Sequence, residues 1–216
     1  MLPQGLDASY VSGGVDYGRV RRPLPVSKAL DDVLLAYEMN GEPLPPDHGF
    51  PVRLVVPGWI GIASIKWLGQ LEVSRQPLVS PWNTRWYRLT GGAYPADSPI
   101  TSQTVKSALE LARGAELVSD RSRVSGRARS GTSPIRRVEI SADGGSSWRR
   151  AHLHAKRTDG WTQWTYELPR LETGAGELWA RAEDRDGRTQ PLAVPYNENG
   201  YLFDGIVRHP IAVRQA

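Results

Sequence analysis

Short runs in which apolar and polar residues alternate fill the second half of the chain, from about Pro99 onward. The runs occupy residues 117–124, 135–141, 148–153, 162–168 and 177–183, separated by Gly, Asp and Pro. Asp143-Gly144-Gly145 stands between two runs and supplies residues that tolerate positive φ, which is typical of a hairpin. Short strands at this spacing predict an antiparallel β-sandwich of immunoglobulin type.

The first half has a less regular pattern. Residues 1–30 are rich in Gly, Pro and Ser, which predicts loops. Over residues 27–39 the apolar positions 30, 33, 34 and 37 have helical spacing, so we expect a short helix capped by Ser27 that ends before Asn40-Gly41. The aromatic residues at 82, 86 and 87 are interpreted as an apolar plug between two domains. The expected fold is mixed α+β, mostly β, with domains at 1–97 and 98–216.

A Gly-containing bend in the first half concentrates polar and cationic side chains. Apolar runs at 53–56 and 60–71 flank Pro57-Gly58 and predict a strand, a tight turn and a second strand. This arrangement brings together four side chains, those of His48, Arg53, Ser64 and Lys66. Such a bend suits an anionic ligand, because backbone N–H groups approach closely where no Cβ intervenes. The alternative is a β-bend with ordinary surface cations.

Composition excludes several classes of protein. The net charge of the 216 residues is +4, and the arginines are scattered rather than forming the basic stripe of a nucleic-acid binder. No apolar run is long enough to span a bilayer, and the first residues show no signal peptide. The compartment is left open. The absence of cysteine excludes disulfides, thiolate metal sites and cysteine nucleophiles.

Familiar catalytic motifs are missing from the sequence. It contains no Walker A sequence, no His-Glu-x-x-His and no Gly-x-Ser-x-Gly. His152 and His154 alternate along a predicted strand and share one face. No acidic residue stands at ligand spacing from them, so we interpret both as exposed strand residues rather than as a zinc site, and predict no metal ligand in this chain.

Three segments together resemble one enzyme family. Residues 34–73 closely resemble the cofactor-wrapping segment of the sulfite oxidase family of molybdopterin enzymes, and residues 136–148 and 179–191 look like the two signatures of its C-terminal dimerisation domain. The resemblance covers most of residues 5–213. It implies that 1–97 is the C-terminal part of the molybdopterin-binding domain and that 98–216 is an immunoglobulin-like dimerisation domain. One departure is Arg129, where the family usually has Trp.

The resemblance also implies cofactor-binding residues. Gly5-Leu6-Asp7 is similar to the family turn whose aspartate, here Asp7, contacts the pyranopterin. His48 and Arg53 match its cofactor-binding His and Arg, and Ser64-Ile65-Lys66 matches its pterin-phosphate contact. Arg and Lys neutralise phosphate charge, while a hydroxyl and backbone amides give directional hydrogen bonds.

Two residues match the catalytic positions of the family. Tyr17, in Asp16-Tyr17-Gly18, resembles its active-site tyrosine, and Arg208 resembles an arginine near its substrate pocket. A tyrosine hydroxyl and a guanidinium suit a small oxyanion, because both donate hydrogen bonds to negative charge. The alternative for Arg208 is a surface cation at the edge of the sandwich.

The function implied by the resemblance is that of a molybdenum-molybdopterin oxidoreductase. It transfers an oxygen atom to or from a small oxyanion such as sulfite, forms a homodimer, and passes electrons to an acceptor such as a cytochrome. A nitrate reductase-type molybdenum enzyme is the alternative within the family.

The missing cysteine conflicts with this function. Sulfite oxidases hold molybdenum through one cysteine thiolate in the part of the fold that precedes the matched region, and this chain has none. We therefore expect the chain to be the C-terminal portion of a longer enzyme, inactive by itself. The other hypothesis is an inactive fragment that serves as a dimerisation module.

Overall fold

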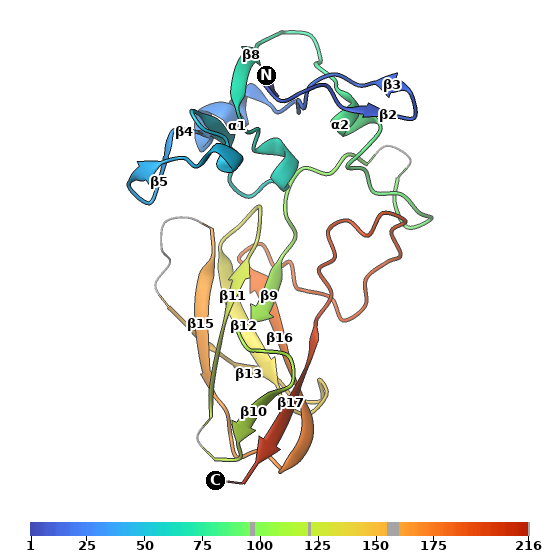
Figure 1. Ribbon diagram of the computed structural model, residues 1–216. Coiled ribbons are helices and arrows are strands. Elements are labelled where there is room, and N and C mark those ends of the chain that lie inside the picture. The colour runs from blue at the N-terminus through green and yellow to red at the C-terminus, as the bar shows by residue number, and fades with distance from the viewer. Residues whose placement is uncertain (96–97, 121, 155–159, 216) are drawn as a thin grey trace. The chain divides into compact units, whose positions relative to one another are not determined.

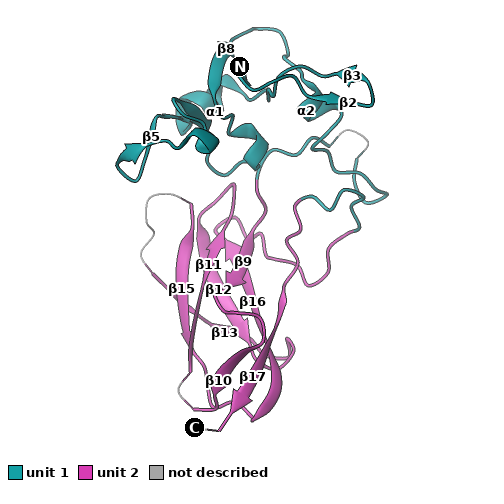
Figure 2. Ribbon diagram, in the orientation of Figure 1, with its two compact units in different colours: residues 1–102, 196–201 teal, residues 103–195, 202–216 magenta. Residues whose placement is uncertain are grey.

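The structure is a computed structural model that describes residues 1–95, 98–120, 122–154 and 160–215. The chain divides into two compact units (Figure 2). Unit 1 comprises Met1–Ser102 with Tyr196–Tyr201, and unit 2 comprises Gln103–Pro195 with Leu202–Ala216. The domain boundary at residue 97 stays a prediction. Within the described residues, no helix has the length and apolar character needed to cross a membrane.

Unit 2 is a two-sheet β-sandwich (Figure 1). In the part of the chain that is described, one sheet has the order β10 (Ala115–Val118), β17 (Arg208–Arg214), β16 (Gly174–Asp184), β12 (Ile135–Ser141) and β13 (Arg149–Arg150). The other has the order β14 (His152–Leu153), β15 (Thr162–Glu167), β11 (Arg123–Arg129) and β9 (Lys106–Leu109). The pair β10–β17 is parallel, and the remaining pairs of the two sheets are antiparallel.

The core of unit 2 lies between the two sheets. Val138, Ile140 and Leu178 come from the larger sheet, and Val124 and Trp164 from the smaller, all buried in one cluster. Alternate residues of β12 and β16 point inward because successive side chains of a strand face opposite sides of the sheet. The prediction of a mostly β chain with a sandwich is confirmed. Its immunoglobulin type stays a prediction.

Two of the predicted strand ranges are wrong in detail. Residues 117–124 are not one strand, because β10 ends at Val118 and β11 begins at Arg123, with the Ser122 hydroxyl bonded to the Val118 carbonyl at 2.8 Å between them. Residues 148–153 divide between β13 and β14, which belong to different sheets. Ala151, 4% exposed, lies where the chain crosses between the sheets. An alternating pattern continues through such a crossing and therefore does not reveal it.

The predicted turn at Asp143-Gly144-Gly145 joins β12 to β13. Gly144 and Gly145 have φ of 68° and 89°, a region that glycine enters without steric cost. The side chain and backbone N–H of Ser147, with the hydroxyl of Ser141, donate to Asp143 and lower the pKa of its carboxyl to about 2. The Asp143 carboxylate therefore stabilises the turn by accepting hydrogen bonds from neighbouring residues.

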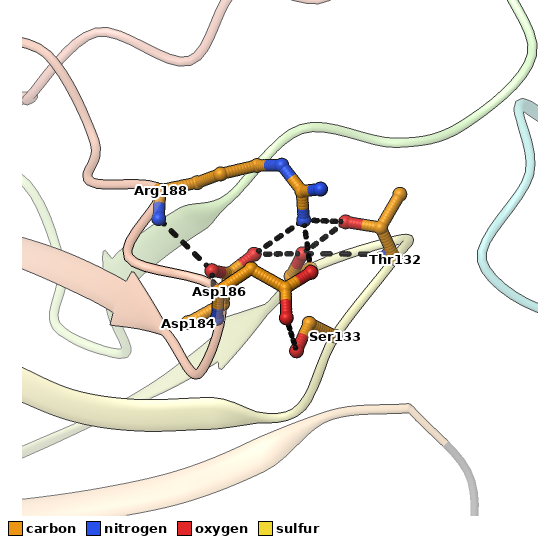
Figure 3. A network of polar contacts seen from close by, with 6 residues as sticks. Thr132, Ser133, Asp184, Asp186 and Arg188 are labelled. Carbon is orange, nitrogen blue, oxygen red and sulfur yellow. Dashed lines mark hydrogen bonds and ion pairs between the residues drawn. The ribbon is translucent and has the colours of Figure 1, made fainter.

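A second turn, after β16, is built around the fully buried carboxylate of Asp184 (Figure 3). Asp184 accepts hydrogen bonds from the backbone N–H groups of Asp186 and Arg188, both at 3.0 Å, and from the Ser130 hydroxyl at 2.9 Å. Burial acts to raise the pKa of Asp184, but the bonds from Arg188 and Ser130 outweigh it and leave the pKa lowered. This network ties the turn to the loop between β11 and β12.

Unit 1 consists mainly of short strand pairs and loops. Its strand pairs are β1 (Leu2–Gly5) with β8 (Leu68–Glu72), β2 (Val11–Ser12) with β3 (Val15–Asp16), β4 (Leu34–Ala36) with β7 (Arg53–Val55), and β5 (Glu38–Met39) with β6 (Glu42–Pro43). Its helices are α1 (Val26–Asp31), η1 (Pro46–His48), η2 (Gly61–Ala63) and α2 (Pro81–Thr84). A small core of Leu24, Leu54, Val56, Ala63 and Ile65 holds these pieces together.

The predicted helix over residues 27–39 is mostly wrong. Helix α1 starts after Pro25 rather than at a Ser27 cap and ends at Asp31, after which β4 and β5 occupy the rest of the range. Asp31 and Asp32 stand at the C-terminal end, where negative charge opposes the helix dipole. Leu34 then pairs with Val55 in a ladder between β4 and β7. Pairing with a distant strand thus overrides the local helical spacing.

The predicted hairpin about Pro57-Gly58 is also wrong. Residues 60–71 contain η2 and a loop before β8 begins at Leu68, and β8 pairs with β1, not with β7. Two backbone hydrogen bonds nevertheless join the sides of the bend, from Leu54 N to Ile65 O and from Leu68 N to Val52 O, both at 2.8 Å. The two sides of the segment are therefore joined through their backbones, across a wider bend than predicted.

Candidate functional site

Arg53 stands at the centre of the predicted cofactor segment. From β7 its guanidinium donates to the carbonyl oxygen of His48 at 3.0 Å and to that of Ser64 at 3.2 Å. Its Nε atom is buried and has no hydrogen-bond partner among the described residues. Burial lowers the pKa of Arg53, which is a sign that its charge is only partly compensated.

Lys66 is the second cation of this segment. Its ammonium donates to the carbonyl oxygen of Asp47 at 2.6 Å and lies 5.6 Å from the centre of the Trp67 ring. The Trp67 indole N–H donates to the carbonyl oxygen of Pro46 at 2.8 Å. Lys66, Trp67 and Arg53 thus each donate to a different backbone carbonyl of η1.

Gly49 allows η1 to lie this close to the cations. Its φ is 106°, and a Cβ there would stand 3.1 Å from the Lys66 Cα and from the Arg53 Cβ. Only glycine adopts this conformation and leaves this space without strain. His48, just before it, ends η1 with an exposed side chain.

The remaining two residues of the predicted phosphate contact are engaged within the protein. The Ser64 hydroxyl accepts a hydrogen bond from Val56 N at 3.1 Å. Ile65 is 3% exposed, with its side chain in the core and its carbonyl bonded to Leu54 N. Ser64 and Ile65 thus fix the bend, and direct contact with a ligand stays a prediction for both.

Asp7 is joined to the same segment through the backbone. Its carboxylate accepts from Val20 N at 3.3 Å, and Leu6 N donates to the Trp67 carbonyl at 2.8 Å. Gly5 permits this turn, because the Asp7 carboxylate occupies the position that a Cβ at Gly5 would take. Asp7 therefore lies on the turn bonded to the residue that follows Lys66.

Tyr17 lies in a different part of unit 1, within an aromatic cluster. Its ring centre is 4.7 Å from that of Trp86 and 6.2 Å from that of Tyr10, and the Arg85 guanidinium lies 5.2 Å from it. The cluster includes Trp82, which is buried and whose ring is 5.7 Å from that of Trp86. Trp82 and Trp86 thus pack within unit 1, and a plug between domains stays a prediction.

Arg208 belongs to unit 2, where it begins β17. Its guanidinium lies 5.0 Å from the centre of the Trp179 ring on the neighbouring strand β16. The catalytic roles of Arg208 and Tyr17 stay predictions. Arg129, the departure from the family pattern, is half-buried with its guanidinium 5.3 Å from the Trp161 ring.

The two predicted surface histidines are exposed, as expected. His152 lies in β14 and His154 just after it, with ring centres 5.0 Å apart. Among the described residues, no group of three or more His, Asp and Glu is arranged to hold a metal ion.

Sequence reasoning missed a second perturbed group, Tyr87 with Arg22. Arg22 is 1% exposed and donates to the carbonyl oxygens of Trp82 and Ile100, and its burial lowers its pKa to about 10. Burial and the neighbouring Tyr201 raise the pKa of Tyr87. The φ of Tyr87 is 54°, which is unusual for a bulky residue. Shifted pKa values and unusual backbone angles cluster at functional sites. In the sequence, the adjacent Arg21 and Arg22 before Pro23 are the feature that could have drawn attention to this group.

Two family descriptions match the chain in succession. "Oxidoreductase molybdopterin binding domain" matches residues 3–82, and "Mo-co oxidoreductase dimerisation domain" matches residues 92–213. The first therefore covers the cluster of Arg53, Lys66 and Asp7, and the second covers Arg208.

Curated relatives and a solved structure agree with these matches. Mitochondrial sulfite oxidase of Homo sapiens is 36% identical over 220 residues, which are 92% of this chain and 39% of that protein. The NAD(P)H nitrate reductase of Hordeum vulgare is 32% identical over 88% of this chain and 24% of its own length. The crystal structure of the sulfane dehydrogenase SoxCD from Paracoccus pantotrophus matches all of this chain and 57% of that chain, with a TM-score of 0.81 and 28% identity. The chain spans about two fifths of the length of the human relative.

Proposed function

Because this chain belongs to the sulfite oxidase family of molybdopterin-dependent oxidoreductases, we propose that its first unit holds the pterin and phosphate of a molybdenum cofactor. The enzyme of which it is part transfers an oxygen atom to or from a small oxyanion such as sulfite. Unit 2 supplies the dimerisation domain, which supports a homodimer. The enzyme passes its electrons to an acceptor such as a cytochrome.

The observation that carries the proposal is the pair of cations at the wide bend. Arg53 and Lys66 donate to backbone carbonyls, and neither forms an ion pair with a carboxylate within the described residues. The buried Nε of Arg53 still lacks a partner there. Two positive charges without acidic partners, held next to a glycine turn, fit an anionic group such as a phosphate. The residues present therefore fit the cofactor.

The roles of the side chains follow from their chemistry. Arg53 and Lys66 neutralise phosphate charge, with His48 at the rim, and Asp7 accepts hydrogen bonds from N–H groups of a pterin. Tyr17 and Arg208 donate to the oxyanion substrate. When bound, the cofactor supplies the two-electron redox chemistry, which no side chain of this protein can replace.

A nitrate reductase-type enzyme is the second candidate. The similarity to the nitrate reductase of Hordeum vulgare covers 88% of the chain, which favours it. The absence of cysteine instead favours a chain that is inactive by itself and contributes only binding and dimerisation. Both alternatives keep the two units as described. The first changes the oxyanion substrate, and in the second the chain catalyses no reaction by itself.

Pterin binding tests the proposal directly. The purified chain is mixed with molybdopterin, and bound pterin is measured by its fluorescence after gel filtration, for the wild type and for Arg53→Ala, Lys66→Ala and Lys28→Ala. Lys28 of α1 forms an ion pair with Asp32, just after the helix, and serves as the control. We expect the wild type and Lys28→Ala to retain pterin and the other two to lose at least about tenfold in affinity. Equal retention by all four would contradict the proposal.

The metal content provides an independent check. The chain has no cysteine and therefore no thiolate to hold molybdenum. We expect the purified chain to carry pterin without stoichiometric molybdenum by elemental analysis. Stoichiometric molybdenum would require a different set of ligands.

A further inference from the structure

Two cations stand directly opposite each other on the sheet of unit 2 that contains β9 and β11. Lys106 of β9 pairs in register with Arg129 of β11, so their side chains emerge on the same side of the sheet. The next pair, Ser107 with Ala128, is buried, which places Lys106 and Arg129 on the outward side. Like charges directly opposite each other destabilise an antiparallel pair of strands. The sheet therefore carries a repulsion at this position that a bound anion would remove.

The two cations differ from their neighbour on the same face. Arg127, two residues before Arg129 on β11, pairs with the Glu110 carboxylate, with Nε to Oε1 at 2.6 Å. Within the described residues, Lys106 and Arg129 donate to neutral oxygens and form no ion pair with a carboxylate. The charge of Asp204 acts on Lys106 without such a pair. The position is therefore short of negative charge.

Aromatic rings and neutral acceptors hold both cations in place. The Lys106 ammonium donates to the Phe203 carbonyl oxygen at 2.7 Å and lies 5.1 Å from the centre of the Phe203 ring. The Arg129 guanidinium donates to the side-chain oxygen of Gln103 and lies 5.3 Å from the centre of the Trp161 ring. An ammonium and a guanidinium each have further N–H groups to donate. Because both side chains are already ordered, a ligand that accepts those groups costs little side-chain entropy.

Burial makes the shortage of negative charge matter. Lys106 and Arg129 are both half-buried, and burial lowers the pKa of Arg129. Burial and then the charge of Arg129 lower the pKa of Lys106, and the Asp204 carboxylate acts in the opposite direction. Burial also raises the pKa of Asp204, against the effect of Lys106. An anion beside the two cations would favour their charged forms.

We propose that Lys106 and Arg129 form a binding site for a small doubly charged oxyanion such as sulfate. A dianion next to both cations replaces one repulsion by two attractions, and its oxygen atoms match the fork of the guanidinium. Chloride has neither the second charge nor separate acceptor atoms. Arg129 stands where the family usually has Trp, so the site is a property of this chain. It is built from residues of unit 2 alone and does not rest on the proposed function.

Trp161 provides a local report of binding, because its ring lies against the Arg129 guanidinium. Its indole N–H resonance is assigned with Trp161→Phe and followed by nuclear magnetic resonance while sodium sulfate is added to the full chain. Sodium chloride at equal ionic strength is the reference. The variants are Lys106→Gln, Arg129→Gln and the matched control Arg127→Gln, which removes a cation of the same face that already has Glu110 as its partner.

We expect sulfate to shift the wild-type resonance in a saturable way, with a Kd on the order of 1 mM, and chloride to leave it in place. Lys106→Gln and Arg129→Gln should each weaken binding at least about tenfold, and Arg127→Gln less than about twofold. If circular dichroism shows that one of the first two fails to fold, the other carries the test. Equal shifts with the two salts, a shift that does not saturate, or one affinity in all variants would overturn the proposal.

Arg53→Ala separates this site from the cofactor site of the proposed function. It removes a cation of unit 1 and should leave the sulfate titration of Trp161 unchanged, whether or not the chain retains pterin. A loss of the sulfate response in Arg53→Ala would contradict a site built from unit 2 alone. A normal response in a chain that binds no pterin would overturn the proposed function and support the anion site.

Discussion

The guanidinium of Arg53 donates to the carbonyl oxygen of His48 at 3.0 Å, so the two residues predicted to bind cofactor are already joined in the protein. The bond runs from β7 to the end of η1 and fixes the cation through the backbone of His48 rather than through its imidazole. The imidazole therefore remains exposed while the loop that carries it is held in place.

Arg53→Lys separates the two roles of Arg53. A lysine keeps the positive charge but cannot donate at the same time to the carbonyl oxygens of His48 and Ser64 in the fork geometry of a guanidinium. We expect pterin affinity to fall for Arg53→Lys by less than for Arg53→Ala, and amide hydrogen exchange over residues 46–50 to rise in both. Unchanged exchange in both variants would show that Arg53 does not hold η1.

Gly49→Ala should strain the site without removing a charge. The new Cβ would stand 3.1 Å from backbone and side-chain atoms of Lys66 and Arg53, at a φ of 106°. We expect a cost of about 1–3 kcal/mol, because a residue with a Cβ rarely adopts this conformation. Hydrogen exchange of the amides of His48 and Leu68, which donate to the carbonyl oxygens of Pro45 and Val52, reports the local loss of stability. Gly61→Ala is the control, since no atom lies within 4 Å of a Cβ there, and it should leave exchange at these residues unchanged.

Asp184→Asn should destabilise unit 2. The carboxylate is fully buried and accepts from the Ser130 hydroxyl and from two backbone N–H groups, and an amide in its place loses charge-assisted bonds. We expect a loss of about 2 kcal/mol in the free energy of unfolding, measured by urea denaturation followed by tryptophan fluorescence. Asp186→Asn is the control, because the Asp186 side chain is 50% exposed and its pair with Arg188 should contribute little.

The same carboxylate predicts a dependence of stability on pH. The folded pKa of Asp184 lies below its ordinary value, so the stability that it contributes is present above the unfolded pKa and is lost as the pH falls through the folded one. Asp143, with a folded pKa of about 2, acts in the same direction. We expect the melting temperature of unit 2 to fall below a pH of about 4. Asp184→Asn should flatten this part of the profile, and an unchanged slope would contradict the assignment to Asp184.

Sequence patterns predicted the parts of the fold that depend on neighbouring residues. Strand β12 was predicted within its observed bounds because alternation along residues 135–141 matches a half-buried strand, and the turn at Gly144-Gly145 was predicted because few other residues adopt positive φ. The failures depend on distant pairing. Leu34 follows helical spacing yet pairs with Val55.

The candidate site, like the fold, was predicted from the sequence only in part. The sequence resemblance pointed to Arg53 and Lys66, and in the structure both donate hydrogen bonds to backbone carbonyls of η1. It did not point to Tyr87, because the buried Arg22 that affects its pKa lies far from it in the sequence. A buried guanidinium that donates to the carbonyls of Trp82 and Ile100 leaves no periodic signal in the chain.

Arg208 permits a kinetic prediction in an active enzyme that contains this chain. If Arg208 contacts the substrate, Arg208→Ala removes a charge-assisted donor to an oxyanion, which contributes about 1.5–3 kcal/mol. We expect kcat/KM for sulfite to fall roughly 10- to 100-fold, mainly through a higher KM. Arg208→Lys should recover only part of the loss, since a point charge does not reproduce the guanidinium fork.

Trp179 distinguishes this role from a purely structural one. The Arg208 guanidinium lies 5.0 Å from the Trp179 ring, so Arg208→Ala also removes a stacking contact. Trp179→Phe keeps an aromatic ring beneath Arg208 while losing the N–H bond to Glu177. If Arg208 binds substrate, Trp179→Phe should change KM far less than Arg208→Ala does, at comparable melting temperatures. Equal kinetic losses in the two variants, or unchanged kinetics in Arg208→Ala and Arg208→Lys, would assign Arg208 to the surface of the sandwich, because a cation that only stacks has no direct effect on an anionic substrate.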